Sequence, residues 1–233
     1  MRYLSPTLLL ALVLCLPAFA DAEQSLEADY GRFLRTLEYE DLDGIKSTVM
    51  LYRNVKDIED RQDAIEFLDS PKAGRLAPIR LDYKWDREAG VELRVLIFHV
   101  DQQWLDDPWL KWYYRPFPLP GFVDMQEIDE LFSHRLSEDA DGRLLVDFYP
   151  RDKSKMEGVP LNNFSWRIDR KRLLLKTVEM RANGFRVDVD FIYRWARLPE
   201  FVVGRIIEPG GQQHQAFGSR IKFDTIAQES SSE

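Results

Sequence analysis

The sequence contains a single cysteine, Cys15, and only three histidines among its 233 residues. Because Cys15 lies near the N-terminus, the rest of the chain can form no disulfide and offers no thiolate for catalysis or metal binding. His99, His134 and His214 are far apart, and none belongs to a metal-ligand motif such as His-Glu-x-x-His. The sequence therefore predicts neither a metal site nor a cofactor.

The motifs of nucleophilic catalysis and of phosphate binding are also missing. No serine nucleophile elbow occurs, and Gly210-Gly211 stands alone and indicates a turn. Neighbouring carboxylates at Asp106-Asp107, Glu138-Asp139 and Asp188 to Asp190 could supply an acid and a base, but such pairs usually form solvated faces. We predict that the protein is not an enzyme, with an envelope hydrolase based on paired carboxylates as a minor alternative.

The first apolar run is too short to span a membrane. It extends from Leu8 to Leu16, below the ~20 residues that a spanning helix needs, and Pro17 follows it. Together with Arg2 before it and the small residues after it, this run is typical of a secretory signal peptide. We predict a signal peptide over residues 1–20, cleaved after Ala20 or Ala22, and a periplasmic protein. A lipoprotein signal that modifies Cys15 is an alternative, which the bulky Leu14 before it disfavours.

Basic residues form no cluster. The chain has 32 Lys and Arg against 40 Asp and Glu, a net charge of −8, and the two signs alternate along the sequence. This excludes nucleic acid and anionic membrane surfaces as expected partners. The length fits one domain, which we predict over residues 23–226, with a disordered tail over 227–233. We expect a monomer.

The pattern that dominates the chain is the antiparallel β-hairpin. Asn183-Gly184 is the strongest hairpin signal. A two-residue loop there fixes a register that pairs apolar residues on one face: Ala182 with Phe185, Met180 with Val187, Val178 with Val189, and Leu174 with Tyr193. The alternation of Ile79 to Trp85, followed by a strand over 91–100, predicts a second hairpin.

Helical spacing occurs in fewer places. Apolar residues three or four apart predict helices over 23–37 and 123–136, and less clearly over 57–69. The fold class is therefore mainly β (α+β): a strongly curved antiparallel sheet or unclosed β-barrel of about eight or nine strands, with an N-terminal helix and one or two further helices on its concave side.

The concave side of such a sheet is either filled by side chains or open to an apolar ligand. The residues expected on its wall are Trp166, Val178, Met180, Val187, Val189, Phe191 and Tyr193. The proline-rich segment that follows residue 102 is the candidate lid, through Trp104, Trp109, Trp112, Phe117 and Phe122. The alternatives are that the wall is simply core and the segment a connection packed on the sheet edge.

The order of these patterns resembles a known family. Trp166-Arg167-Ile168-Asp169, then a strand, the Asn183-Gly184 turn, a long alternating strand and Leu198-Pro199 are similar to the bacterial periplasmic outer-membrane lipoprotein-sorting carriers, the lipoprotein localisation factor-like half-barrels. The resemblance implies an unclosed barrel whose apolar concave side shelters acyl chains. The tryptophan-rich segment 103–122 departs from that family, and no lid residue of the family maps onto this chain.

The resemblance implies a periplasmic, non-enzymatic carrier or binder of acylated or lipidic cargo. Its expected partners are an acyl lipid or a lipoprotein, with membrane proteins of the envelope as further partners. A second interpretation is an envelope interaction or scaffold protein with a solid core, which would use its aromatic segment to meet a protein partner.

Overall fold

The structure is a computed structural model that describes residues 24–39, 44–53, 79–97, 100–102, 112, 115–157, 159, 161–182, 184–193, 197–211 and 213–225. Along parts of the first four strands and of the last strand, only the backbone path is described. The predicted signal peptide, the predicted helix over 57–69, Trp104, Trp109 and the C-terminal tail lie outside the described residues.

The described strands form one antiparallel sheet in the order β4-β3-β2-β1-β11-β10-β9-β8-β7-β6-β5. In chain order they are β1 (Gly44–Arg53), β2 (Ile79–Asp86), β3 (Gly90–Ile97), β4 (Val100–Gln102), β5 (Phe132–Glu138), β6 (Leu144–Pro150), β7 (Leu161–Asp169), β8 (Leu174–Ala182), β9 (Phe185–Ile192), β10 (Phe201–Ile207) and β11 (Gln213–Thr225).

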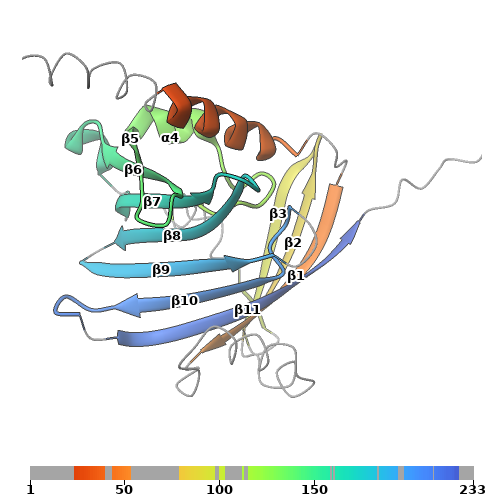
Figure 1. The fold of residues 1–233 in the computed structure, drawn as a ribbon. Coiled ribbons are helices and arrows are strands. Elements are labelled where there is room, and N and C mark those ends of the chain that lie inside the picture. The colour runs from red at the N-terminus through yellow and green to blue at the C-terminus, as the bar shows by residue number, and fades with distance from the viewer. Residues whose placement is uncertain are drawn as a thin grey trace, which may run out of the picture.

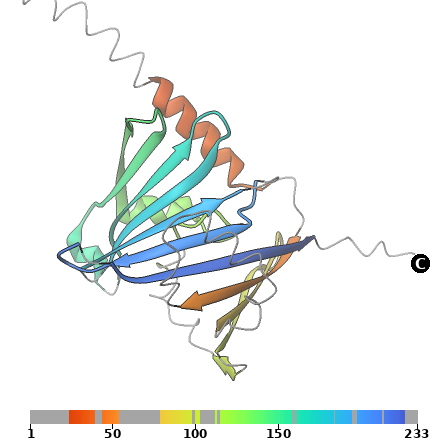
Figure 2. The ribbon, with the colours of Figure 1, turned by 60° about the horizontal axis from the view of Figure 1, so that its bottom comes forward.

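Most of the sheet is a meander of consecutive strands, and its first strand pairs with its last. Strands β5 to β11 follow one another across it, and β1 then pairs with β11 on one side and with β2 on the other. Figures 1 and 2 show that the sheet twists and curves strongly between its two ends, β4 and β5, without closing on itself. The fold class predicted from the sequence is confirmed, with eleven strands in place of eight or nine.

The helices lie at the β5 end of the sheet. An N-terminal helix occupies residues 24–36, and α4 (Met125–Leu131) lies beside it; both cover the end formed by β5 to β8 (Figure 1). Asp124 begins α4, since its carboxylate accepts the backbone N–H of Glu127 at 3.1 Å. A short 3-10 helix, η3 (Lys153–Met156), joins β6 to β7.

The predicted register of the β8–β9 hairpin is confirmed. The ladder runs from Ala182 opposite Phe185 to Thr177 opposite Asp190, and includes Val178 opposite Val189. It ends before the predicted Leu174–Tyr193 pair, although the Tyr193 hydroxyl still donates to the Leu175 carbonyl at 2.8 Å. The β2–β3 hairpin is confirmed as well, from Asp86 opposite Gly90 to Ile79 opposite Ile97.

The helix predicted over 123–136 is wrong in its second half. Helix α4 ends at Leu131, and residues 132–138 form strand β5, which pairs with β6. Phe132 and Leu136 are four residues apart, a spacing that places side chains on one face in a helix and also in a strand. Pairing with β6 decides between the two, because it buries Phe132 fully while keeping the backbone hydrogen bonded.

The buried residues form two clusters. The main cluster joins the inner face of β5 to β10 to the N-terminal helix, α4 and Trp112. The second cluster lies at the other end and consists of Tyr39, Ile45, Tyr83, Trp85, Leu119 and Phe122. Phe117 and Leu37 pack against both clusters, so the segment around Phe117 connects the two ends of the sheet.

Candidate functional site

The seven residues predicted to line the concave wall share one face of the sheet. Six are buried in the main cluster, and Val187 packs against it half-buried. Trp166, Val178, Val189 and Phe191 have no exposed surface. The structure therefore brings the predicted wall together, and in this state it is covered.

Aromatic rings build the β5 to β7 part of this wall. The rings of Phe148 and Phe164 stack with their centres 4.2 Å apart, and Trp166 meets Phe148 edge-on at 4.8 Å. The N-terminal helix covers them through Phe33, whose ring contacts Trp166 at 5.7 Å. Trp112, a predicted lid residue, lies over Phe132 at 5.9 Å.

A proline-rich segment crosses the rest of the wall. We call residues 115–122 the proline strap, because Pro116, Pro118 and Pro120 alternate in it. The residues between them turn to the two clusters: the Phe117 ring meets Phe191 edge-on at 5.4 Å, and Leu119 is buried in the second cluster. Of the predicted lid residues in the strap, Phe117 therefore lies on the wall, and Phe122 is buried in the second cluster.

Each proline carbonyl of the strap accepts a hydrogen bond from an aromatic side chain. Trp166 Nε1 on β7 donates to Pro116 at 3.0 Å. The Tyr39 hydroxyl, just after the N-terminal helix, donates to Pro118 at 2.6 Å, and the Tyr83 hydroxyl on β2 donates to Pro120. Three separate elements therefore hold one short segment through its carbonyls.

The far end of the strap lies very close to the β2–β3 hairpin. Gly121 has φ +74°, and a Cβ atom at this position would lie 2.2 Å from Val91 Cγ2 and 2.8 Å from Trp85 Cδ1. Only glycine fits there, for both its backbone angle and its space. Arg115 closes the strap by donating to the Phe122 carbonyl at 2.9 Å and pairing with Glu127 of α4 at 2.6 Å.

The buried phenol groups keep their protons at neutral pH. Burial raises the pKa of Tyr83 and of Tyr193 well above the ordinary value for tyrosine. Their hydroxyls are therefore hydrogen-bond donors under all physiological conditions. Tyr193 uses its hydroxyl within the sheet, on the Leu175 carbonyl, whereas Tyr83 uses it on the strap.

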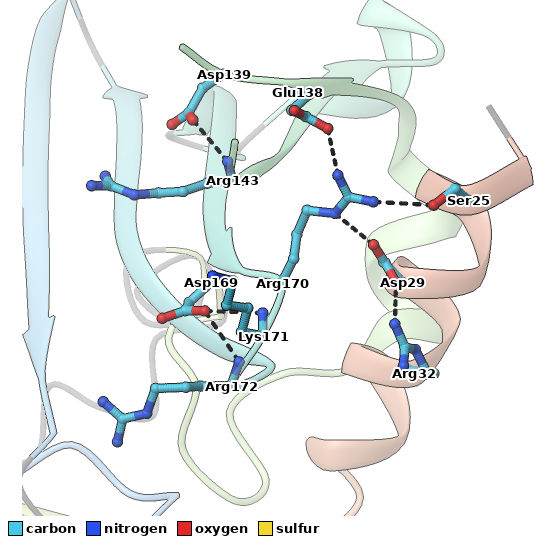
Figure 3. Close-up of polar contacts among 10 residues, drawn as sticks. All are labelled: Ser25, Asp29, Arg32, Glu138, Asp139, Arg143, Asp169, Arg170, Lys171 and Arg172. Atoms are coloured by element: carbon cyan, nitrogen blue, oxygen red, sulfur yellow. Dashed lines mark hydrogen bonds and ion pairs between the residues drawn. The ribbon is translucent and has the colours of Figure 1, made fainter. Parts of the chain in front are cut away.

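The N-terminal helix is held by a charged junction that the sequence analysis did not predict. Arg170, in the β7–β8 turn, donates through Nε to Asp29 at 2.5 Å, through Nη2 to Ser25 at 3.1 Å, and through Nη1 to Glu138 at the end of β5 (Figure 3). Asp29 also pairs with Arg32 of its own helix. We call this set the Arg170 junction.

The turn that carries Arg170 is shaped by its own sequence. The Asp169 carboxylate accepts the backbone N–H groups of Lys171 and Arg172 at 3.0 and 3.1 Å, as Figure 3 shows. Burial raises the pKa of Asp29, but the hydrogen bonds and charges of Arg32 and Arg170 outweigh it, and the pKa lies below the usual value. Asp29 is therefore ionised at neutral pH.

A pocket on the opposite face of the sheet is polar. It lies over β6 to β8 and is lined by Asp147, Phe148, Tyr149, Asn163, Phe164, Ser165, Glu179 and Arg181. Burial raises the pKa of Asp147, against the opposing charges of Arg135 and Arg167. Glu179 lies within 3.6 to 4.0 Å of Arg167, Arg181 and Arg186. Charged and polar side chains make up most of the lining, so this pocket does not suit an acyl chain.

The carboxylates considered for catalysis have structural partners where they are described. Glu138 belongs to the Arg170 junction, and Asp139 accepts the N–H groups of Asp141 and Arg143. Asp188 pairs with Arg186, and Asp190 accepts the Thr177 hydroxyl. Asp106 and Asp107 lie outside the described residues.

Metal-binding clusters and membrane-spanning helices are both absent from the described residues. No group of three or more His, Cys, Asp or Glu side chains there could hold a metal ion. Within the same residues, no helix has the length and apolar content that crossing a membrane requires. The side chains of His99 and His214 are outside the description.

No protein-family model matches the chain, and no curated protein sequence matches it. Similar solved structures include a domain assigned to the outer membrane lipoprotein-sorting proteins from Vibrio parahaemolyticus, with 12% identity, a TM-score of 0.45, and 89% of this chain and 95% of that chain covered. A DUF1329 family protein from Desulfovibrio piger has 10% identity and a TM-score of 0.44, over 87% and 94% of the two chains. A LolA superfamily protein from Nitrosomonas europaea has 10% identity and a TM-score of 0.42, over 88% and 94%.

Proposed function

We propose that this chain is a periplasmic, non-enzymatic carrier or binder of acylated or lipidic cargo, which holds acyl chains on the apolar inner face of its sheet. One observation carries the proposal: the inner face is continuous and apolar, and part of its cover is a short segment that belongs to neither the sheet nor a helix. A cover of this kind can leave while the sheet stays intact. The monomeric state and the export by a cleaved signal peptide remain part of the proposal.

The affinity would come from the area of the inner face. Apolar surface removed from water contributes roughly 25 cal/mol per Å². In the closed state the proline strap occupies part of this area through Phe117, so the cargo must exchange with that segment. Such an exchange permits both uptake and release, which a carrier needs.

The first test is purification of the mature protein from its native envelope without detergent, followed by native mass spectrometry and lipid extraction. A carrier yields a bound mass that extracts as acyl lipid or lipopeptide, and the delipidated protein takes up a fluorescent fatty acid. A clean apo mass together with no uptake would contradict the proposal.

A pair of matched variants then locates the cargo. Val187→Asp places a charge on the inner face, whereas Val203→Asp places it on the outer face of the neighbouring strand β10; both valines are half-buried. We expect Val187→Asp to reduce fatty acid uptake at least tenfold and Val203→Asp to leave it unchanged, with folding of both checked by circular dichroism. Equal uptake by the two variants would place the cargo elsewhere.

The second candidate is an envelope interaction protein with a solid core. The complete burial of Trp166, Val178, Val189 and Phe191 favours it, because a face without exposed surface needs no ligand. In that case the purified protein carries no lipid, and Val187→Asp lowers its stability without changing any ligand binding.

A further inference from the structure

We infer that the cargo of this face carries acyl carbonyl groups, as in an ester or an amide, and that Trp166, Tyr39 and Tyr83 bind those carbonyls when the proline strap leaves. The inference rests on the proposed function and adds the chemical class of the cargo. A cargo without a carbonyl is disfavoured, whether an alkane, which has no acceptor, or a dialkyl ether, whose oxygen is a weaker acceptor. Three hydrogen bonds hold the strap, and each comes from one of these aromatic side chains.

The three donors are buried in apolar surroundings. Trp166 has no exposed surface, and Tyr39 and Tyr83 are 3% and 2% exposed. Trp166 lies among the rings of Phe33, Phe148 and Phe164, and Tyr83 belongs to the second cluster. Each donor meets its strap acceptor at the inner face, where an acyl chain would lie.

A cargo that displaces the strap removes these acceptors. A buried donor left without an acceptor lowers affinity by about five- to a hundredfold, because its hydrogen bond to water or to protein is not replaced. Three such donors would outweigh much of what a bare hydrocarbon chain gains by burial. A carbonyl next to the acyl chain restores the bond, since it offers the same acceptor as the proline carbonyl.

The protonation of the donors agrees with this role. Burial raises the pKa of Tyr83 well above its ordinary value, so the phenol remains a donor and cannot act as an acceptor-only phenolate. An indole N–H is a donor at every pH. The three donors are therefore matched by acceptor atoms on the cargo.

The test compares a diacylglycerol with the dialkyl ether of glycerol that has the same two hydrocarbon chains. Both compete with a fluorescent fatty acid for the full mature protein. We expect the ester to bind at least tenfold more tightly. An N-acylated peptide and its N-alkyl counterpart, measured in the same way, separate an ester source of the carbonyl from an amide source.

Variants assign the preference to named donors. Tyr39→Phe combined with Tyr83→Phe should reduce the ester preference to below about threefold, because two of the donors are gone. Tyr30→Phe is the matched control: it also removes a buried tyrosine hydroxyl, but one on the N-terminal helix that makes none of the hydrogen bonds to the strap, and it should keep the preference. If the double variant does not fold, the single variants Tyr39→Phe and Tyr83→Phe are used.

The outcomes are distinguishable. Equal binding of ester and ether by the wild-type protein overturns this inference and leaves the carrier proposal standing. Loss of the preference in Tyr30→Phe as well overturns the assignment to the strap donors. Failure of the wild-type protein to bind either lipid or the fatty acid overturns the proposed function, and this inference with it.

Discussion

The two ends of the sheet are covered in different ways. At the β5 to β8 end, helices cover the main cluster through ring contacts such as Phe33 on Trp166, and the Arg170 junction fixes them with charged groups. At the β1–β2 end, the proline strap covers the second cluster, and hydroxyl groups of Tyr39 and Tyr83 hold it by its carbonyls.

This difference indicates which cover can open. Withdrawing the helix would break the charge-assisted hydrogen bond of Arg170 to Asp29 and expose the ring of Phe33 and its partner Trp166 to water. Withdrawing the strap from Pro116 to Pro120 breaks three neutral hydrogen bonds, each with a net contribution of about 1 kcal/mol, in addition to its apolar contacts, and the Arg115–Glu127 pair lies at one end of this stretch. The core under the helices is therefore the permanent part and the proline strap is the exchangeable cover, with Trp166 at the boundary between them.

The largest expected effect is at the permanent core. Trp166→Ala should lower the free energy of unfolding by about 3–5 kcal/mol, because it removes a fully buried ring and leaves a cavity. Phe185→Ala, at an exposed aromatic residue of the same sheet, should change it by less than about 1 kcal/mol. Urea unfolding, followed by far-ultraviolet circular dichroism, measures the free energy of unfolding of both variants. Similar losses in the two variants would contradict a solid core at this end.

The packing of the strap can be disturbed without changing the side chains that donate hydrogen bonds to it. Gly121→Ala should destabilise by about 2–3 kcal/mol, since the new Cβ has an unfavourable φ and meets Val91 and Trp85. Gly142→Ala has nearly the same φ, but its Cβ would lie 3.7 Å from the nearest atom, so it should lose only about 1 kcal/mol. Thermal unfolding compares them. An equal loss would mean that the strap does not pack on the β2–β3 hairpin.

The Arg170 junction can be tested with two variants in the β7–β8 turn. Arg170→Met should lower stability by about 2 kcal/mol and speed hydrogen exchange in the helix of residues 24–36, because Asp29 keeps only Arg32 as partner. Arg172→Met is the control, since the backbone N–H that bonds Asp169 is retained and its exposed side chain points away from the helix in Figure 3. Faster exchange in both variants would argue against a specific junction.

The smallest effect concerns pH. The folded pKa of Asp29 is below its unfolded value, so its contribution to stability is complete above about pH 4 and is lost as the pH falls through the folded pKa. The difference in unfolding free energy between wild type and Asp29→Asn should be constant from about pH 7 to about pH 5, and should shrink below about pH 4. A difference that already shrinks near pH 6 would contradict the lowered pKa.

The sequence predicted those features of the fold that depend on residues close together in the chain. The alternation around Asn183-Gly184 fixed the β8–β9 register, and the inner face of Val178 and Val189 followed from it. Phe132 and Leu136 were misassigned to a helix because their spacing of four fits both periods, and only the pairing with β6 separates them.

The long-range contacts could not be predicted in the same way. Arg170 lies 141 residues from Asp29, and Tyr39 lies 79 residues from Pro118. No periodicity links such pairs. One signal was present in the sequence: the alternation of Pro116, Pro118 and Pro120 removes backbone donors but leaves carbonyls, so it indicates a segment held by side-chain donors from elsewhere.

The pairing of β1 with β11 has a consequence for the order in which the chain can fold. Strand β1 has its neighbours in β2 and in the last strand of the sheet, so the β1–β4 unit joins the rest only after nearly the whole chain is present. Contacts of such sequence separation form late and slowly. During synthesis the N-terminal strands wait with an unpaired edge, a template for association with other chains, and a holding chaperone would protect the newly made protein until β11 arrives.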